Sequence, residues 1–238
     1  MHSKRLPAVI LSVVALVGLT AAMPASPGGV RTYEVSITNL TGGQPLTPAL
    51  VTTHRGSDGL FEVGSEAEFE LKEIAENGNL APMIQRVSSD RDFYDLVVEQ
   101  GSTLPPVLPG EMVSFEITAT PEFNFLSWAS MLICTNDGFT GIDTLKLPAR
   151  VGQSFTVSTQ GYDAGTEVNT ELFADMVPPC GPLTGQDSGG QGTDASDPAL
   201  AENGAIFHHA GIGGVGDLDP SINDWTNPVA VITVERTG

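Results

Sequence analysis

The sequence predicts an all-β fold, an antiparallel β-sandwich with one or two short helices. Several segments alternate apolar and polar residues, and the stretches between them are rich in Gly, Pro, Asn and Asp. Helical periodicity is confined to short segments of the chain. Alternation with a period of two is typical of strands with one buried face, and such strands usually form antiparallel rather than parallel sheets.

We expect five clear strands, at residues 32–39, 111–120, 128–134, 153–159 and 229–235. The first and second alternate cleanly, and in the first the side chains of 33, 35 and 37 fall on one face. The segment 128–134 (WASMLIC) is apolar almost throughout, which favours a central strand. Together these segments supply enough strands for one sandwich.

One helix is expected after residue 65. Ser65 and Glu68 have the spacing of a capping box, an apolar face follows, and Asn77-Gly78 is a typical helix end. A short helical turn is expected over 170–176, because two prolines follow it directly. The segment 181–204 is rich in Gly, Ser, Asp and Pro, which predicts a long surface loop rather than a linker between domains.

The first residues have the pattern of an export signal. Lys4 and Arg5 precede an apolar run at 8–19, and small residues follow it. This pattern predicts a signal peptide over residues 1–25, cleaved after Ala22 or Ala25, and a single domain over 26–238. No later apolar run approaches the ~18 residues that a membrane helix needs, so we expect an exported chain without an integral membrane segment. Periplasmic and extracellular locations both remain open.

The chain is strongly acidic. It has 29 Asp and Glu against 10 Lys and Arg, a net charge of −19, and loss of a leader containing Lys4 and Arg5 makes the remainder more negative. Such a surface repels a phosphate backbone, which argues against nucleic acid as a partner. The same excess suits a protein that binds divalent cations, although solubility alone also accounts for it.

Two cysteines, Cys134 and Cys180, are an even count in a chain expected to be exported, so we expect a disulfide between them. A bridge closing a loop of this length stabilises the fold by roughly 4 kcal/mol through chain entropy. The alternative is a pair of free thiols with a metal or redox role. No C-x-x-C motif supports that alternative.

Three acidic residues stand just after predicted strands. Asp137 follows strand 128–134, while Asp163 and Glu167 follow strand 153–159. If these two strands are neighbours in one sheet, the three carboxylates meet at one rim of the sandwich. Carboxylates collected from loops suit Ca²⁺, which takes 6–8 oxygen ligands in flexible geometry. The alternative is that all three are solvated loop acids.

The spacing within GYDAGTE bears on this choice. Asp163 and Glu167 are four residues apart, and Gly165 between them allows a sharp turn that brings the two carboxylates toward one point. Like charges so close repel each other unless a cation lies between them. A bound cation would therefore explain the composition of this segment.

The segments 125–142 (FLSWASMLICTNDGFTGI) and 161–167 resemble the spondin domain of F-spondin and of small bacterial secreted proteins. Animal members have Pro-Asp-Trp where this chain has Asn136-Asp137-Gly138, and they end the second motif with Asp where this chain has Glu167. The similarity extends over about 33–236. It implies a C2-like antiparallel β-sandwich.

The same resemblance implies that one calcium ion is bound through Asp137, Asp163 and Glu167. The exchange of Asp for Glu at 167 keeps the charge and lengthens the reach by one methylene. It therefore affects the expected denticity and affinity more than binding itself.

Two further motifs give weaker signals. His208 and His209, near Asp217 and Asp219, suggest a zinc or copper site or an acid–base pair, but adjacent side chains on an extended chain point in different directions. The segment 211–216 (GIGGVG) has the G-x-G-x-x-G spacing of a dinucleotide fingerprint, yet it follows the histidines rather than a clear strand. Neither motif by itself predicts a cofactor.

The function that these observations favour is a secreted, non-enzymatic, calcium-binding β-sandwich. We expect it to act as a cell-surface or extracellular-matrix interaction module whose partner is an unknown extracellular protein or glycan. One alternative is a glycosidase-like hydrolase that uses a pair of carboxylates about 5–9 Å apart. Another is a cation-requiring adhesion module that uses the acidic face or the 181–204 loop.

Overall fold

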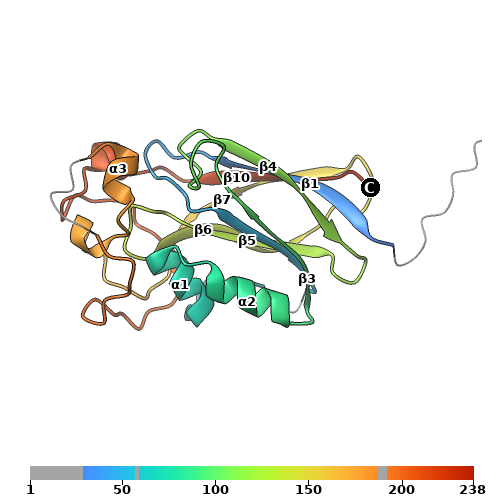
Figure 1. Ribbon diagram of the computed structural model, residues 1–238, viewed down its shortest axis with the longest axis horizontal. Coiled ribbons are helices and arrows are strands. Elements are labelled where there is room, and N and C mark those ends of the chain that lie inside the picture. The colour runs from blue at the N-terminus through green and yellow to red at the C-terminus, as the bar shows by residue number, and fades with distance from the viewer. Residues whose placement is uncertain (1–28, 57–58, 187–191) are drawn as a thin grey trace, which may run out of the picture.

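Two antiparallel sheets pack face to face in the computed structural model, which describes residues 29–56, 59–186 and 192–238 (Figure 1). The four-stranded sheet has the order β4-β1-β10-β7, and the six-stranded sheet has the order β3-β2-β5-β6-β8-β9. The predicted all-β sandwich is confirmed. The signal peptide predicted over 1–25 lies outside the described residues.

The strands and helices have the following bounds. The strands are β1 (Arg31–Asn39), β2 (Ala49–His54), β3 (Phe93–Glu99), β4 (Met112–Ala119), β5 (Phe125–Met131), β6 (Gly138–Lys146), β7 (Ser154–Thr159), β8 (Gly161–Asp163), β9 (Phe207–His208) and β10 (Ala230–Arg236). The helices are α1 (Phe69–Asn77), α2 (Ala81–Ser89), the 3-10 turn η1 (Phe173–Asp175), α3 (Cys180–Thr184) and α4 (Pro220–Asn223).

The core between the sheets follows from the alternation in the sequence. Tyr33, Val35 and Ile37 on β1 are fully buried and face the interior, as their common parity predicts. Trp128 on β5 fills the space from the opposite sheet and is likewise fully buried. The strands predicted at 32–39, 111–120, 153–159 and 229–235 all occur within one residue of their predicted bounds, as β1, β4, β7 and β10.

A helical layer covers the other face of the six-stranded sheet. Leu71 and Ile74 of α1 and Met83 of α2 are fully buried in an apolar cluster that also contains Ala129 and Met131 of β5. Figure 1 shows both helices along one side of this sheet. Because β5 is covered on both faces, its sequence is continuously apolar, which explains the pattern that favoured a central strand.

Helix α1 ends as predicted but begins differently. Gly78 has φ 62°, and its N–H donates to the Ile74 carbonyl at 3.0 Å, a left-handed helix end that glycine favours. The N-cap is Glu68, without a side-chain cap from any described residue, and Ser65 Oγ donates instead to Glu62 at 3.3 Å. The predicted capping box is therefore wrong, because the helix begins at Phe69, four residues after Ser65.

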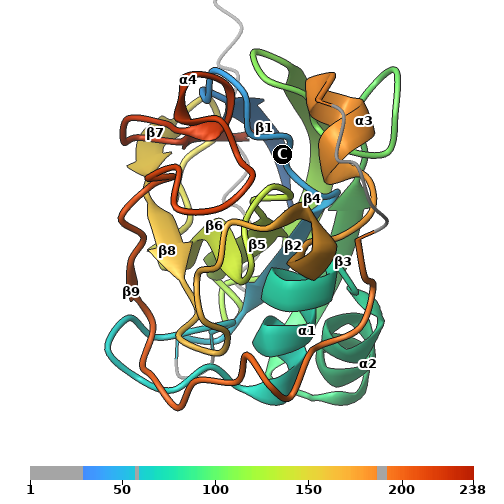
Figure 2. The ribbon, with the colours of Figure 1, turned by 90° about the vertical axis from the view of Figure 1, so that its left-hand side faces the viewer.

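The strand arrangement that was to bring the acidic residues together is also wrong. Strands β5 and β7 belong to different sheets, so they are not neighbours. After β7, the chain crosses at Gln160 to the six-stranded sheet and forms β8, which pairs with β6. This change of sheet carries the GYDAGTE segment beside the start of β6, so the acids come together by a different route (Figure 2).

The turn before β6 and the loop after β8 gather at one end of the sandwich, away from the chain terminus marked in Figure 1. At the opposite end, the Thr32 amide donates to the Gly238 carbonyl at 3.3 Å. The predicted surface loop at 181–204 begins within α3, and its residues 187–191 lie outside the described part. No helix within the described ranges is both long and apolar enough to cross a membrane.

Candidate metal centre

Asp137 occupies the turn between β5 and β6, immediately before the pair that joins β6 to β8. In that pair Gly138 lies opposite Asp163, and the Ala164 amide donates to the Asp137 carbonyl at 3.1 Å. The two acids therefore meet where the start of β6 pairs with the end of β8. Asp137 and Asp163 are both buried, with exposures of 0% and 1%.

One oxygen of Asp137 organises the following loop. Its Oδ2 accepts hydrogen bonds from the amides of Thr166 at 2.7 Å and Glu167 at 3.0 Å, and from the Thr166 hydroxyl at 3.2 Å. Its Oδ1 is buried and has no hydrogen-bond partner among the residues that the structure describes. A buried carboxylate oxygen without a donor is costly, so this atom indicates a missing positive group.

The electrostatics of Asp137 agree with its geometry. Burial and, next, the negative charge of Asp163 raise the pKa of this carboxyl to about 7, against the opposing effect of the hydrogen bonds from Glu167 and Thr166. A cation beside the two carboxylates would oppose both the burial and the repulsion from Asp163, because it favours the ionised form of Asp137. Without one, the pair is short of positive charge.

Asp163 holds its own loop in the conformation that its glycine allows. Its Oδ1 accepts from the Gly165 amide at 2.8 Å, and its Oδ2 accepts from Asn169 Nδ2 at 2.6 Å. Gly165 has φ 69°, and a Cβ there would lie 2.8 Å from the backbone of Gly204. The sharp turn expected at Gly165 is thus present, and two requirements favour glycine there: the positive φ and the close backbone contact.

Glu167 follows the turn at Gly165, and its amide donates to Asp137 Oδ2 at 3.0 Å. Its Oε1 accepts from the Asp197 amide at 3.0 Å, and its backbone forms an isolated bridge with Ala201. Burial, together with the charges of Glu76 and Asp137, raises the pKa of Glu167 to about 7. Glu167 therefore stands between two other acids.

Glu76 was missed by the sequence reasoning. It lies in α1, is 4% exposed, and neither carboxylate oxygen has a hydrogen-bond donor in the described part of the chain. Lys72 Nζ is 3.4 Å from Glu76 Oε1, an i,i+4 ion pair. Such a pair is usual on exposed helix surfaces, so the sequence has no signal that this glutamate is buried.

The four acids form a succession rather than a closed cage. Asp163 neighbours Asp137, Asp137 neighbours Glu167, and Glu167 neighbours Glu76. Within residues 29–56, 59–186 and 192–238, no three His, Cys, Asp or Glu side chains are arranged as a ready metal-binding group. The donors nevertheless suit a hard cation, because they are carboxylate oxygens, and those of Asp137 and Glu76 include buried atoms that lack a donor among described residues.

Another carboxylate at this end of the sandwich has hydrogen-bond donors for both of its oxygens. Glu171 accepts hydrogen bonds from three consecutive amides, those of Gly213 at 2.7 Å, Gly214 at 2.6 Å and Val215 at 2.8 Å. Consecutive amides of this kind form an anion-binding nest. The GIGGVG segment, whose spacing resembled a dinucleotide fingerprint, thus binds a carboxylate of its own chain.

Asn136 links the two arrangements. Its Oδ1 accepts from the amides of Thr170 at 3.1 Å and Glu171 at 3.3 Å. The adjacent residues Asn136 and Asp137 therefore hold two successive parts of the same loop. The turn before β6 therefore holds the loop after β8 in place through these two side chains.

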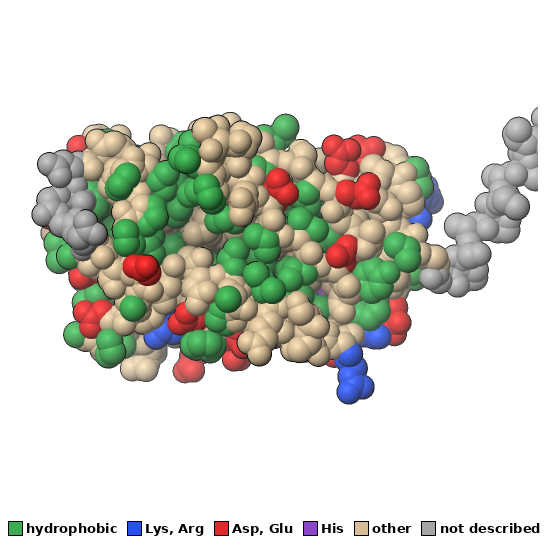
Figure 3. Space-filling view, viewed as in Figure 1, with side chains coloured by type: hydrophobic (Ala, Val, Ile, Leu, Met, Phe, Trp, Pro, Cys, Tyr) green, Lys and Arg blue, Asp and Glu red, His purple; other side chains and the backbone are tan. Residues whose placement is uncertain are grey.

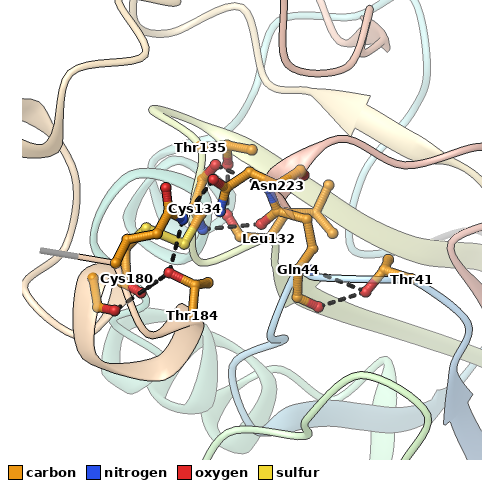
Figure 4. Close-up of a disulfide and its surroundings, with 10 residues drawn as sticks. Thr41, Gln44, Leu132, Cys134, Thr135, Cys180, Thr184 and Asn223 are labelled. Atoms are coloured by element: carbon orange, nitrogen blue, oxygen red, sulfur yellow. Dashed lines mark hydrogen bonds between the residues drawn. A yellow bond between two sulfur atoms is a disulfide. The ribbon is translucent and has the colours of Figure 1, made fainter. Parts of the chain in front are cut away.

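The predicted disulfide joins Cys134 in this turn to Cys180 in α3, with a Cα–Cα distance of 5.1 Å (Figure 4). Gln44 supports the same turn, because its Oε1 accepts from the Cys134 amide at 3.0 Å and its Nε2 donates to the Asn223 carbonyl at 2.7 Å. The cysteines are confirmed as a structural bridge, and the alternative of free thiols is wrong.

The two histidines face different surroundings, as expected for neighbours on an extended chain. The His208 ring stacks on Tyr162 at 5.3 Å, while the His209 ring contacts Trp225 at 5.0 Å. Burial lowers the pKa of His209, and its Nδ1 accepts from the Gly211 amide at 3.0 Å. The pair does not form one site.

Comparison with known proteins gives one clear match. The family model described as Spondin_N matches residues 43–175. This region includes Asp137, Asp163, Glu167 and Glu76. Among curated proteins, none matches the chain.

Proposed function

The chain belongs to the spondin N-terminal domain family, and from that premise we propose that it is an exported, calcium-stabilised interaction module. Asp137, Asp163 and Glu167 are the residues that would hold the calcium ion. The ion would supply the positive charge that these carboxylates lack. The observation that carries this proposal is the buried Oδ1 of Asp137, which receives no hydrogen bond from any described residue although Asp163 lies beside it.

The proposal places the ion where it would fix the shape of a surface. Asp137 holds the amides of 166 and 167, and Glu171 holds the amides of 213–215. The same segments expose apolar side chains, namely Val168, Leu172 and Val215, the last of which is 77% exposed. Exposed apolar groups on neighbouring, well-held segments are typical of a protein interaction site.

The charge of the chain supports a partner that is not a polyanion. On the face shown in Figure 3, Asp and Glu side chains are spread over the surface, and Lys and Arg side chains lie mainly toward its lower and right-hand edges. Together with the net charge of −19, this argues for a protein or a neutral glycan as partner. Export is proposed from the predicted leader and agrees with the disulfide.

A non-enzymatic role agrees better with the acids than hydrolysis does. Asp137, Asp163 and Glu167 are all at least 96% buried, and each carboxylate accepts hydrogen bonds from groups of its own chain. A glycosidase needs its two carboxylates on either side of an accessible sugar bond. Polysaccharide hydrolysis that disappeared in the Asp163→Asn variant would instead support the hydrolase alternative.

The experiment that tests the proposal is a thermal melt in EDTA and in about 2 mM calcium, with magnesium as the control. For an extracellular-type site with a dissociation constant near ~0.1 mM, mass action adds roughly 1.8 kcal/mol of stability. For a domain of this size, we expect a rise in Tm of about 4–7 °C with calcium and a clearly smaller one with magnesium. An unchanged Tm in a protein fully stripped by EDTA would contradict the proposal.

A further inference from the structure

Glu76 is a buried carboxylate in an environment that does not satisfy it. Glu76 lies on α1 and is 4% exposed, yet neither oxygen accepts a hydrogen bond from the described residues. Glutamate is almost never fully buried unless it is paired or coordinates a metal. A buried glutamate in this position therefore needs a positively charged partner.

The surroundings of Glu76 supply only part of that charge. Lys72 Nζ lies 3.4 Å from Oε1, but the Lys72 side chain is 33% exposed and is therefore partly screened by water. On the other side lies Glu167: Asn77, the neighbour of Glu76, donates from Nδ2 to Ser196 Oγ at 3.1 Å, and the next residue, Asp197, donates its amide to Glu167 Oε1 at 3.0 Å. One partly exposed ammonium thus faces two buried carboxylates.

We propose that Glu76 is a further ligand of the calcium site, reaching it from α1 beside Glu167. The inference rests on the proposed function and adds a residue that the two loop motifs do not contain. It explains why Glu76 is buried without a donor among the described residues, and why the Glu167 carboxylate lies between it and Asp137. It also couples α1 to the loops at the rim.

A direct consequence concerns Lys72. Its ammonium and a divalent cation are attracted to the same carboxylate, so Lys72 competes with calcium for Glu76. Removal of the Lys72 charge should therefore tighten calcium binding, whereas removal of the Glu76 charge should weaken it. A purely structural Lys72–Glu76 pair makes neither prediction.

The test is a calorimetric calcium titration of the full chain and of two glutamate variants. Glu76→Gln should raise the calcium Kd at least about ten-fold, the scale expected for loss of one charged ligand. Glu73→Gln is the matched control, because it removes the same charge from the same helix and keeps an oxygen for Asn79 Nδ2, which now donates to Glu73 at 2.8 Å. Equal Kd values for the two variants would overturn the inference.

Lys72→Met supplies a second and independent test. We expect its calcium Kd to fall several-fold, while Lys146→Met, at the far end of β6, leaves it unchanged. In the Glu76→Gln background, Lys72→Met should change the calcium Kd little, because Lys72 then has no Glu76 carboxylate to compete for. The four proteins together form a double-mutant cycle, which isolates the coupling between the two side chains. If Glu76→Gln does not fold, the single Lys72→Met variant decides: a lower Kd supports the inference, and an unchanged or higher Kd overturns it.

Calcium binding by the chain and the role of Glu76 as a ligand would be contradicted by different results. A wild-type chain that takes up no calcium overturns the proposed function and the role of Glu76 together. A wild-type chain that binds calcium, with Glu76→Gln indistinguishable from Glu73→Gln, overturns only the role of Glu76.

Discussion

Two buried glutamates at the same end of the sandwich have opposite surroundings. Glu171 receives three backbone hydrogen bonds from residues 213–215, whereas Glu76 receives none from the described residues and has an ion pair with Lys72. The difference teaches that burial alone does not define a candidate site. A carboxylate that the chain itself satisfies fixes a loop, and one that lacks donors is available to a cation.

The comparison extends to Asp137, which combines both conditions in one side chain. Its Oδ2 has three donors and its Oδ1 has none among the described residues. Asp137 Oδ2 therefore holds a loop through hydrogen bonds, as the Glu171 carboxylate does. Asp137 Oδ1 lacks a donor, as the oxygens of Glu76 do. Variants at these positions should separate calcium-independent stability from calcium-dependent stability.

The largest effect should come from the bridge that supports both regions. Replacing Cys134 and Cys180 by Ala should lower the free energy of unfolding by about 4 kcal/mol, because the unfolded chain regains the entropy of a loop spanning 46 residues. Denaturant unfolding with and without calcium measures this loss. We expect the same loss in both, and a loss confined to calcium would show that the bridge acts through the metal site instead.

Glu171→Ala should be next, with a loss of about 3 kcal/mol, because three part-buried backbone hydrogen bonds to a charged acceptor are lost and loop 211–218 is released. Glu171→Gln should lose clearly less, since one oxygen can still accept from Gly214 and Val215. Thermal melts should give the same difference in EDTA and in calcium. A loss that calcium restores would contradict the distinction between Glu171 and Glu76.

Asp137→Asn should remove the calcium response, about 2 kcal/mol at 2 mM calcium, and leave stability in EDTA equal or higher. The amide keeps the oxygen that accepts from Thr166 and Glu167 and removes the charge that repels Asp163. Glu116→Gln, exposed on the outer face of β4, is the control that changes net charge equally. A parallel drop in EDTA and calcium would mean that Asp137 is structural only.

The smallest effect concerns exposed carboxylates. Glu34 on β1 lies opposite both Glu116 on β4 and Glu235 on β10, so three like charges stand side by side on the outer face. Glu34→Thr should raise stability by about 0.5 kcal/mol, and the gain should shrink in high salt. A gain that persists in 1 M salt would indicate strand propensity rather than relief of repulsion.

The sequence predicted the regular parts of the fold because their burial has a simple period. Strands β1 and β4 alternate, and their buried residues are apolar. Strand β2 was missed because its buried residues include Thr52, Thr53 and His54, which have no apolar signature. Strand β8 was missed because it has only three residues, although it decides which sheet carries Asp163.

The candidate site was only partly accessible to sequence reasoning. The motif resemblance identified Asp137, Asp163 and Glu167, and the structure brings Asp137 close to both others. Glu76 comes from a helix about 60 residues earlier in the chain, and its burial depends on how α1 packs on the six-stranded sheet. The carboxylate nest of Glu171 depends on backbone conformation, which no side-chain pattern specifies.

A crystal structure of the chain grown with calcium tests the central claim most directly. The account predicts one cation at the rim, within the usual 2.3–2.6 Å of Asp137 Oδ1 and of an Asp163 oxygen. It also predicts that the Glu171 carboxylate remains on the amides of 213–215. A structure in which the same Oδ1 is hydrogen-bonded to water or to a protein donor, with no cation beside it, would contradict the account.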